Sequence, residues 1–235
     1  MLTLVLQSEH VNSLENMATA EYRRRHGTLI WRKLSGPAVQ TRVTFSMENQ
    51  RARTVCFAML FETGLGFVGV LIAWLVGFSL RSQFALGLDS VLRGVIASLF
   101  MIAVLVVSYE TNWSVLVKLR QEVEVIVSQL FADCRTVDLL LISVAAGFGE
   151  EILFRGALQP LFVSGSNPWI GILSASLLFG LAHALSLAYF IAATLTGIYF
   201  GYLAFAYSDL IAPIVAHTVY DFFALVYVQS RLARK

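Results

Sequence analysis

Long apolar stretches separated by short polar segments dominate the chain from residue 55 onward. Each is about 20 residues long, enough for a helix to cross a hydrocarbon core of about 30 Å. The six stretches cover residues 55–80, 91–111, 137–163, 169–187, 188–207 and 211–229. Because an open sheet cannot satisfy its backbone hydrogen bonds in lipid, we expect all six to be helices.

The segment between the second and third apolar stretches, residues 112–136, is more polar. It carries Lys118, Arg120, Glu122 and Glu124 among apolar residues at roughly helical spacing. This pattern is typical of an amphipathic helix that lies at the membrane interface. The predicted fold class is therefore all-α: a polytopic membrane helix bundle of about six transmembrane helices and one interfacial amphipathic helix.

Residues 1–46 differ from the rest of the chain. They are polar and mixed, and they show no sustained helical or strand period. We expect a disordered N-terminal segment, or a non-native stretch upstream of a start at Met47. Residues 47–136 are expected to contain two transmembrane helices and the interfacial helix, and residues 137–230 a membrane core that carries the polar motifs.

Composition agrees with a membrane protein. The chain is 57% hydrophobic and 14% charged, whereas about 25% of the residues of an ordinary soluble domain are charged. The net charge of +2 is too small to indicate nucleic-acid binding. We therefore expect an integral, multi-pass membrane protein whose surroundings are the lipid bilayer.

Basic residues are distributed unevenly between the two predicted sides of the membrane. One side carries Arg51, Arg53, Lys118, Arg120, Arg135, Arg231, Arg234 and Lys235, and the other carries Arg81 and Arg93. Because cytoplasmic loops are enriched in Lys and Arg, we expect both termini to be cytoplasmic.

The third apolar stretch contains three ionisable residues, Glu150, Glu151 and Arg155. A charged side chain inside a span costs about 2.5 to 3.5 kcal/mol, so such residues usually face a protein interior. Glu151 and Arg155 are four residues apart and share one helix face, where they can pair. Glu150 is rotated by about 100° and is free to face another neighbour. Gly147 and Gly149 allow another helix or a wet cleft to approach closely.

Two later stretches contain histidines: His183 follows Phe179 by four residues, and Asp221 follows His217 by four. A glutamate in apolar surroundings suits a general base, and a histidine can help to hold the water that the base deprotonates. A second imidazole can donate to a developing oxyanion. Alternatively, Glu150, His183 and His217 could bind a divalent metal such as zinc, although the HExxH arrangement is absent.

Each motif taken alone also has a structural explanation. Glu151–Arg155 could be a buried structural pair, His183 a helix-contact residue, and His217–Asp221 a hydrogen-bonded pair. Glu62 in the first stretch is another costly carboxylate, for which helix packing or cavity lining is favoured over catalysis. The co-occurrence of the three motifs in neighbouring helices favours a functional site.

The three motifs resemble those of the CPBP intramembrane proteases (CAAX protease and bacteriocin-processing, also called Abi). The family's EExxxR, FxxxH and HxxxN or HxxxD motifs match Glu150–Arg155, Phe179–His183 and His217–Asp221, in the same order. The resemblance covers about residues 137–230. It implies a helical membrane fold that hydrolyses a membrane-associated peptide, such as a prenylated CAAX-type C-terminus or a leader peptide.

The resemblance also implies roles for individual residues. Glu150 would be the base, His183 would orient the water, and His217 with Asp221 would serve the tetrahedral intermediate. Glu151, Arg155 and Phe179 would support them. An anionic Asp221 would not donate to an oxyanion but would orient His217 and favour its charged form. Both a zinc-dependent and a metal-free glutamate mechanism are compatible with these residues.

Two other functions compete with proteolysis. A non-proteolytic membrane scaffold or chaperone could retain the fold and use the motifs as a polar core. A transporter is less favoured, since paired broken helices in two halves are not evident. One feature fits the predicted spans poorly: His183 lies far along its stretch, whereas His217 lies near the start of its own, where Pro213 indicates a helix N-terminus.

Overall fold

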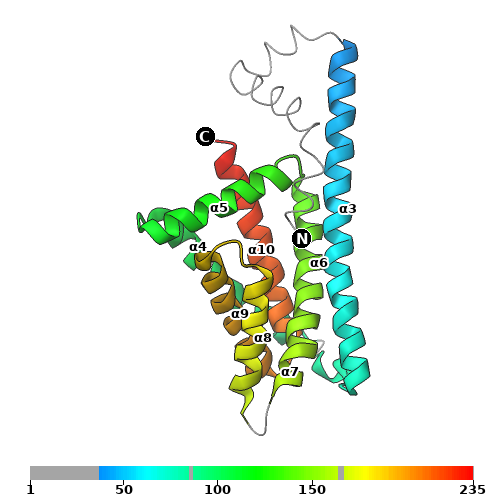
Figure 1. Cartoon of the computed structure of the whole chain (residues 1–235), viewed down its shortest axis with the longest axis vertical. Helices are drawn as coiled ribbons and strands as arrows, with labels where there is room; N and C mark the ends of the chain where they lie inside the picture. Colours follow the sequence, from blue (N-terminus) through cyan, green and yellow to red (C-terminus); the bar gives the residue numbers. More distant parts are fainter. Residues whose placement is uncertain (1–36, 85–86, 164–166, 235) are drawn as a thin grey trace. The chain divides into compact units, whose positions relative to one another are not determined.

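The computed structural model describes residues 37–84, 87–163 and 167–234 (Figure 1). The chain divides after Gln50 into two compact units, and the second, from Arg51 onward, contains all the predicted spans and motifs. Most of the N-terminal segment, residues 1–36, lies outside the described residues. Residues 37–46, at the end of that segment, lie in a helix.

The elements of regular structure in the described residues are helices, which confirms the all-α class. In chain order they are α3 (Pro37–Val76), η1 (Leu80–Gln83), α4 (Leu88–Glu110), α5 (Ser114–Leu130), α6 (Thr136–Glu151), η2 (Ile152–Leu158), α7 (Gln159–Phe162), α8 (Pro168–Ala182), α9 (Leu187–Tyr207) and α10 (Ile211–Leu232).

Within the described residues, four helices are long and apolar enough by themselves to cross a membrane: α3 from Glu48, α4, α9 and α10. The predicted span 137–163 consists of α6, η2 and α7, which follow one another without a break. The predicted span 169–187 was wrong at its end, because α8 has 15 residues and stops at Ala182. With a rise of 1.5 Å per residue, such a helix is about 22 Å long, shorter than the hydrocarbon core.

Small residues hold the bundle together. Helix α10 packs against α4 and α6, and α8 packs against α9. A side chain on Gly147 of α6 would collide with Thr218 of α10, and one on Gly180 of α8 with Thr194 of α9. Without a hydrophobic driving force between helices in lipid, such close backbone approach is what allows dispersion forces to hold them.

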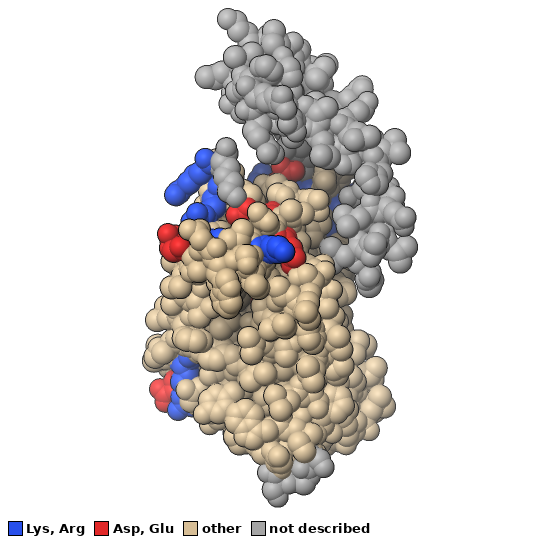
Figure 2. Space-filling view, turned by 60° about the vertical axis from the view of Figure 1, so that its left-hand side comes forward, with Lys and Arg blue, Asp and Glu red and all other residues tan. Residues whose placement is uncertain are grey.

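Polar contacts gather the charged chain segments at one end of the second unit. Arg51 of α3 lies 3.4 Å from Asp138 of α6, and Arg231 of α10 lies 4.0 Å from Glu110 of α4. The amphipathic helix α5 crosses the bundle at this end (Figure 1). Its Arg120 donates to two backbone carbonyl oxygens at the C-terminus of α4. Figure 2 shows most of the visible charged side chains gathered here, with a broad, largely uncharged surface beyond and a small charged group near the opposite end.

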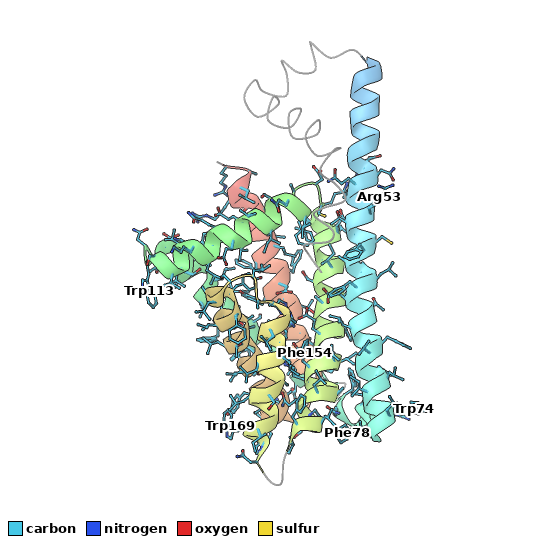
Figure 3. All side chains as sticks on the ribbon, in the orientation of Figure 1. Arg53, Trp74, Phe78, Trp113, Phe154 and Trp169 are labelled. Atoms are coloured by element: carbon cyan, nitrogen blue, oxygen red, sulfur yellow. The ribbon has the colours of Figure 1, made fainter. Side chains whose placement is uncertain are left out.

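Large aromatic side chains lie toward both ends of the second unit. Trp113 precedes α5, whereas Trp74, Phe78 and Trp169 lie at the opposite end (Figure 3). Trp74 and Trp113 are exposed. Trp is enriched at the two membrane–water interfaces, where its ring meets both apolar and polar surroundings. Together with the apolar helices, this distribution makes the chain an integral membrane protein.

Helix α3 crosses α6 and η2 through glycines. A side chain on Gly66 would lie 3.2 Å from the Cα atom of Gly149. A side chain on Gly69 would lie 2.7 to 2.9 Å from backbone atoms of Ile152 and Leu153. Backbone atoms cannot move aside as the end of a flexible side chain can, so Gly69 determines how closely the two helices approach.

Replacing Gly69 with alanine should therefore separate the helices and lower the free energy of unfolding by about 1 to 3 kcal/mol, as overpacking usually does. Thermal unfolding of the purified protein in detergent measures the effect. Gly64 of the same helix is the matched control, because a side chain there meets nothing within 4 Å. Gly64→Ala should be neutral or slightly stabilising. Equal destabilisation by the two variants would contradict this packing.

Candidate active site

The two adjacent glutamates lie where α6 widens into the π-helical segment η2. Segments of π-helix are rare and often occur at functional sites, because the extra residue per turn redirects side chains. Glu150 and Glu151 are both buried in the bundle. The local structure therefore places two carboxylates in the interior within a single turn.

Glu151 forms a fully buried ion pair with Arg155. Its Oε1 accepts a 2.7 Å hydrogen bond from Nη1 of Arg155, which confirms the pairing predicted from the four-residue spacing. The other terminal nitrogen of Arg155 donates to the carbonyl oxygen of Gly197. The guanidinium carbon also lies 4.6 Å from the ring centre of Phe179 and 5.5 Å from that of Phe200. These contacts compensate the loss of hydration of both charges.

His217 lies between three carboxylates. Its Nδ1 is 2.8 Å from Oε1 of Glu151, and its Nε2 is 3.3 Å from Oδ2 of Asp221 and 3.8 Å from Oε2 of Glu150. Its ring is stacked on Phe200. A carboxylate accepts hydrogen bonds, so an imidazole that donates to Glu151 and Asp221 carries protons on both nitrogens and is positively charged. The expected contact with Asp221 is present, but Glu151 is the closer partner.

His183 follows directly after α8, at its C-terminal end. Its Nδ1 donates to the carbonyl oxygen of Phe179 at 2.9 Å, and its ring is stacked on the ring of Phe179. In a neutral imidazole this leaves Nε2 as an acceptor. That atom lies 3.7 Å from Oε1 of Glu150. The side chain of His183 is 31% exposed, so this part of the site is accessible from outside the bundle.

Glu150 is the point at which the three motifs meet. One of its oxygens faces His183 and the other faces His217, although these residues come from α8 and α10. The two histidines meet at Glu150 although they lie at different distances along their helices: His183 lies just beyond the end of the short helix α8. Because α10 begins at Ile211, His217 lies in its second turn.

Glu62 of α3 is a fourth carboxylate at this site, which sequence reasoning had assigned to packing or cavity lining. Its backbone carbonyl contacts Gly149. Its side chain interacts electrostatically with Glu150, His217 and Asp221. Its Oε2 is buried and has no protein hydrogen-bond partner. The cost of a carboxylate in an apolar span was the signal in the sequence that pointed to it.

The candidate metal ligands were tested by the positions of their donor atoms. In the part of the chain that the structure describes, no group of three or more His, Cys, Asp or Glu residues is arranged to hold a metal ion. Nε2 of His183 and Nε2 of His217 instead face opposite oxygens of Glu150. These donor atoms are therefore not arranged around one point as ligands of the zinc ion that the sequence left open as an alternative.

The fold and the site together define a polytopic helical membrane protein with a buried glutamate–histidine–histidine centre. Residues 133–223, which contain all three motifs, match the family model described as type II CAAX prenyl endopeptidase, Rce1-like. Over this segment the chain is similar to the CPBP, or CAAX protease, family of membrane endopeptidases. No curated protein and no solved structure matches the chain significantly.

Removing Arg155 should disrupt the protein itself. Arg155→Ala breaks the buried ion pair and leaves His217 as the one remaining donor to the carboxylate of Glu151, and breaking a buried pair typically costs about 3 to 5 kcal/mol. We expect a large loss of monodisperse protein in size-exclusion chromatography and a lower unfolding temperature. Arg53→Ala removes the same charge from an exposed position and should leave both unchanged. Similar behaviour of the two variants would show that the buried pair is dispensable.

Proposed function

We propose that the protein is an intramembrane endopeptidase that hydrolyses a peptide bond in a prenylated, CAAX-type membrane-associated peptide. The observation that carries this proposal is the convergence of Glu150, His183 and His217 in one buried site. The family description supports the substrate class. Leader peptides are the alternative substrate within the same reaction.

Glu150 is the general base in this proposal. A water molecule beside its Oε1 donates one hydrogen to Glu150 and the other to the free Nε2 of His183. As the water oxygen attacks the carbonyl carbon of the substrate, its proton passes to Glu150. A buried carboxylate suits this role because apolar surroundings strengthen it as a base.

His217 stabilises the tetrahedral intermediate. Its Nε2–H, which faces Asp221 in the resting site, donates to the oxyanion as negative charge develops there. Glu151 holds the opposite nitrogen, and Arg155 in turn holds Glu151, so the imidazole does not need to reorganise. Glu150 then gives its proton to the nitrogen of the leaving group, the C–N bond breaks, and a carboxylate and an amine are released.

The substrate reaches the site from the end that carries α5. Ser186, three residues after His183, donates a 2.7 Å hydrogen bond to Glu122 of α5. This end also carries most of the basic residues that flank the helices, among them Arg51, Arg120 and Arg231. By the positive-inside rule we expect this end to be cytoplasmic, and both chain termini with it.

Glu150→Gln and His183→Ala should each lower kcat/KM by about 100-fold or more, because each removes a proton acceptor for the attacking water. Cleavage of a fluorogenic prenylated peptide by protein in liposomes measures the rate, and mass spectrometry identifies the bond. Glu110→Gln, which alters an exposed carboxylate, is the control. Wild-type rates in both site variants would refute these roles, and an intact cellular phenotype of Glu150→Gln would favour a scaffold.

Asp221→Asn should retain cleavage to within about tenfold, which corresponds to the loss of a single hydrogen-bond contribution. The amide oxygen of asparagine still accepts from Nε2 of His217, and Glu151 still holds Nδ1. The same fluorogenic assay, with Asp221→Ala as the more severe comparison, measures this. A loss as large as that of Glu150→Gln would mean that the charge of Asp221 is essential.

A further inference from the structure

We propose that Glu62 is a further catalytic residue, whose Oε2 accepts the N–H of the scissile peptide bond and so aligns the leaving nitrogen. This inference rests on the proposed endopeptidase function. Glu62 lies on α3, outside the segment 133–223 that matches the family model. The role is therefore derived from the position and contacts of Glu62 alone.

The crossing of α3 and α6 places Glu62 beside the catalytic glutamate. The carbonyl group of Glu62 contacts Gly149, the residue that directly precedes Glu150. Four residues later, Gly66 also approaches Gly149, and Gly69 approaches Leu153. These close contacts involve the backbone of α3, so they hold residue 62 at the site without using its carboxyl group.

The carboxyl group of Glu62 lies near the charged residues of the site. It interacts electrostatically with Glu150, with His217 and with Asp221. Its Oε2 is buried and has no hydrogen-bond partner among the protein groups. A buried oxygen without a partner costs free energy, so a side chain kept in that state inside an apolar helix requires a reason other than stability.

The other carboxylates of the site are less available to a substrate. Oε2 of Glu151 also lacks a donor, but the side chain of Glu151 is fully buried. Oε1 of Glu151 accepts from Arg155 and His217, and Asp221 faces Nε2 of His217. In the proposed mechanism the water engages Glu150 and His183. Glu62, which is only partly buried, therefore offers its unpartnered Oε2 to the one donor that a peptide bond brings, its N–H. A peptide N–H buried without an acceptor would be costly, so this contact favours productive binding.

The contact also serves the last step of the reaction. Accepting the N–H turns the nitrogen so that its developing lone pair points toward Glu150. When Glu150 transfers its proton, the two electrons of the C–N bond remain on nitrogen. The departing amine keeps its hydrogen bond to Glu62. An ester substrate has no N–H at this position, so its cleavage should not depend on Glu62.

The test compares Glu62→Leu and Glu62→Gln with wild type, on a prenylated peptide and on its matched ester, in liposomes. Glu62→Leu should lower kcat/KM for the peptide by about 10- to 100-fold and leave that for the ester within about twofold. Glu62→Gln keeps an acceptor oxygen and should restore most of the peptide activity. The unfolding temperature of Glu62→Leu should equal or exceed that of wild type, because the variant removes an unpartnered buried oxygen.

Each opposing result has a separate meaning. Equal losses on peptide and ester, or a lowered unfolding temperature with proportional loss of both activities, would overturn the role of Glu62 and indicate packing. Unchanged peptide cleavage by Glu62→Leu would overturn it while leaving the endopeptidase function intact. If wild-type protein cleaved neither substrate, the proposed function itself would fail.

Discussion

The ion pair between Glu151 and Arg155 is the interaction on which the rest of the site depends. Two charges removed from water are tolerated only when each is paired and hydrogen-bonded, and here a backbone carbonyl and aromatic rings complete the set. The same oxygen of Glu151 also holds His217. The pair therefore joins η2 to α9 and α10, and it positions the imidazole that faces Glu150.

Close helix crossings bring the remaining groups to this centre. Gly147 admits α10 and Gly149 admits α3, so that two neighbours approach a single turn of α6 from different directions. In lipid, where apolar surfaces gain little by leaving their surroundings, such contacts depend on fit rather than on hydrophobicity. The π-helical segment η2 follows directly after Glu151. The departure from α-helical geometry therefore lies next to the two glutamates.

The carboxylates of the site differ in how they are engaged. Oε1 of Glu151 accepts from both Arg155 and His217, and the side chain is fully buried, which suits a structural support. One oxygen of each of Glu150, Glu151 and Glu62 is buried without a protein donor. An acceptor held in this state is available to water or substrate, at a cost in stability that the surrounding packing must offset. Functional sites are where natural proteins accept such costs.

Local spacing was sufficient to predict part of this structure. The length and composition of the apolar stretches predicted the helical membrane fold, and the four-residue interval predicted the pairing of Glu151 with Arg155, because both follow from the geometry of a single helix. The glycines at 147 and 149 likewise indicated close helix approach before any partner was known.

Contacts between helices were decided by the tertiary structure alone. Only the packed bundle shows that α8 ends before His183, that Glu151 is a closer partner of His217 than Asp221 is, and that Glu62 lies beside Gly149, next to Glu150. Each depends on where one helix crosses another, and periodicity within a helix carries no information about that. The sequence thus determined which polar residues enter the membrane, and the crossings of α3, α8 and α10 with α6 decided which of them meet.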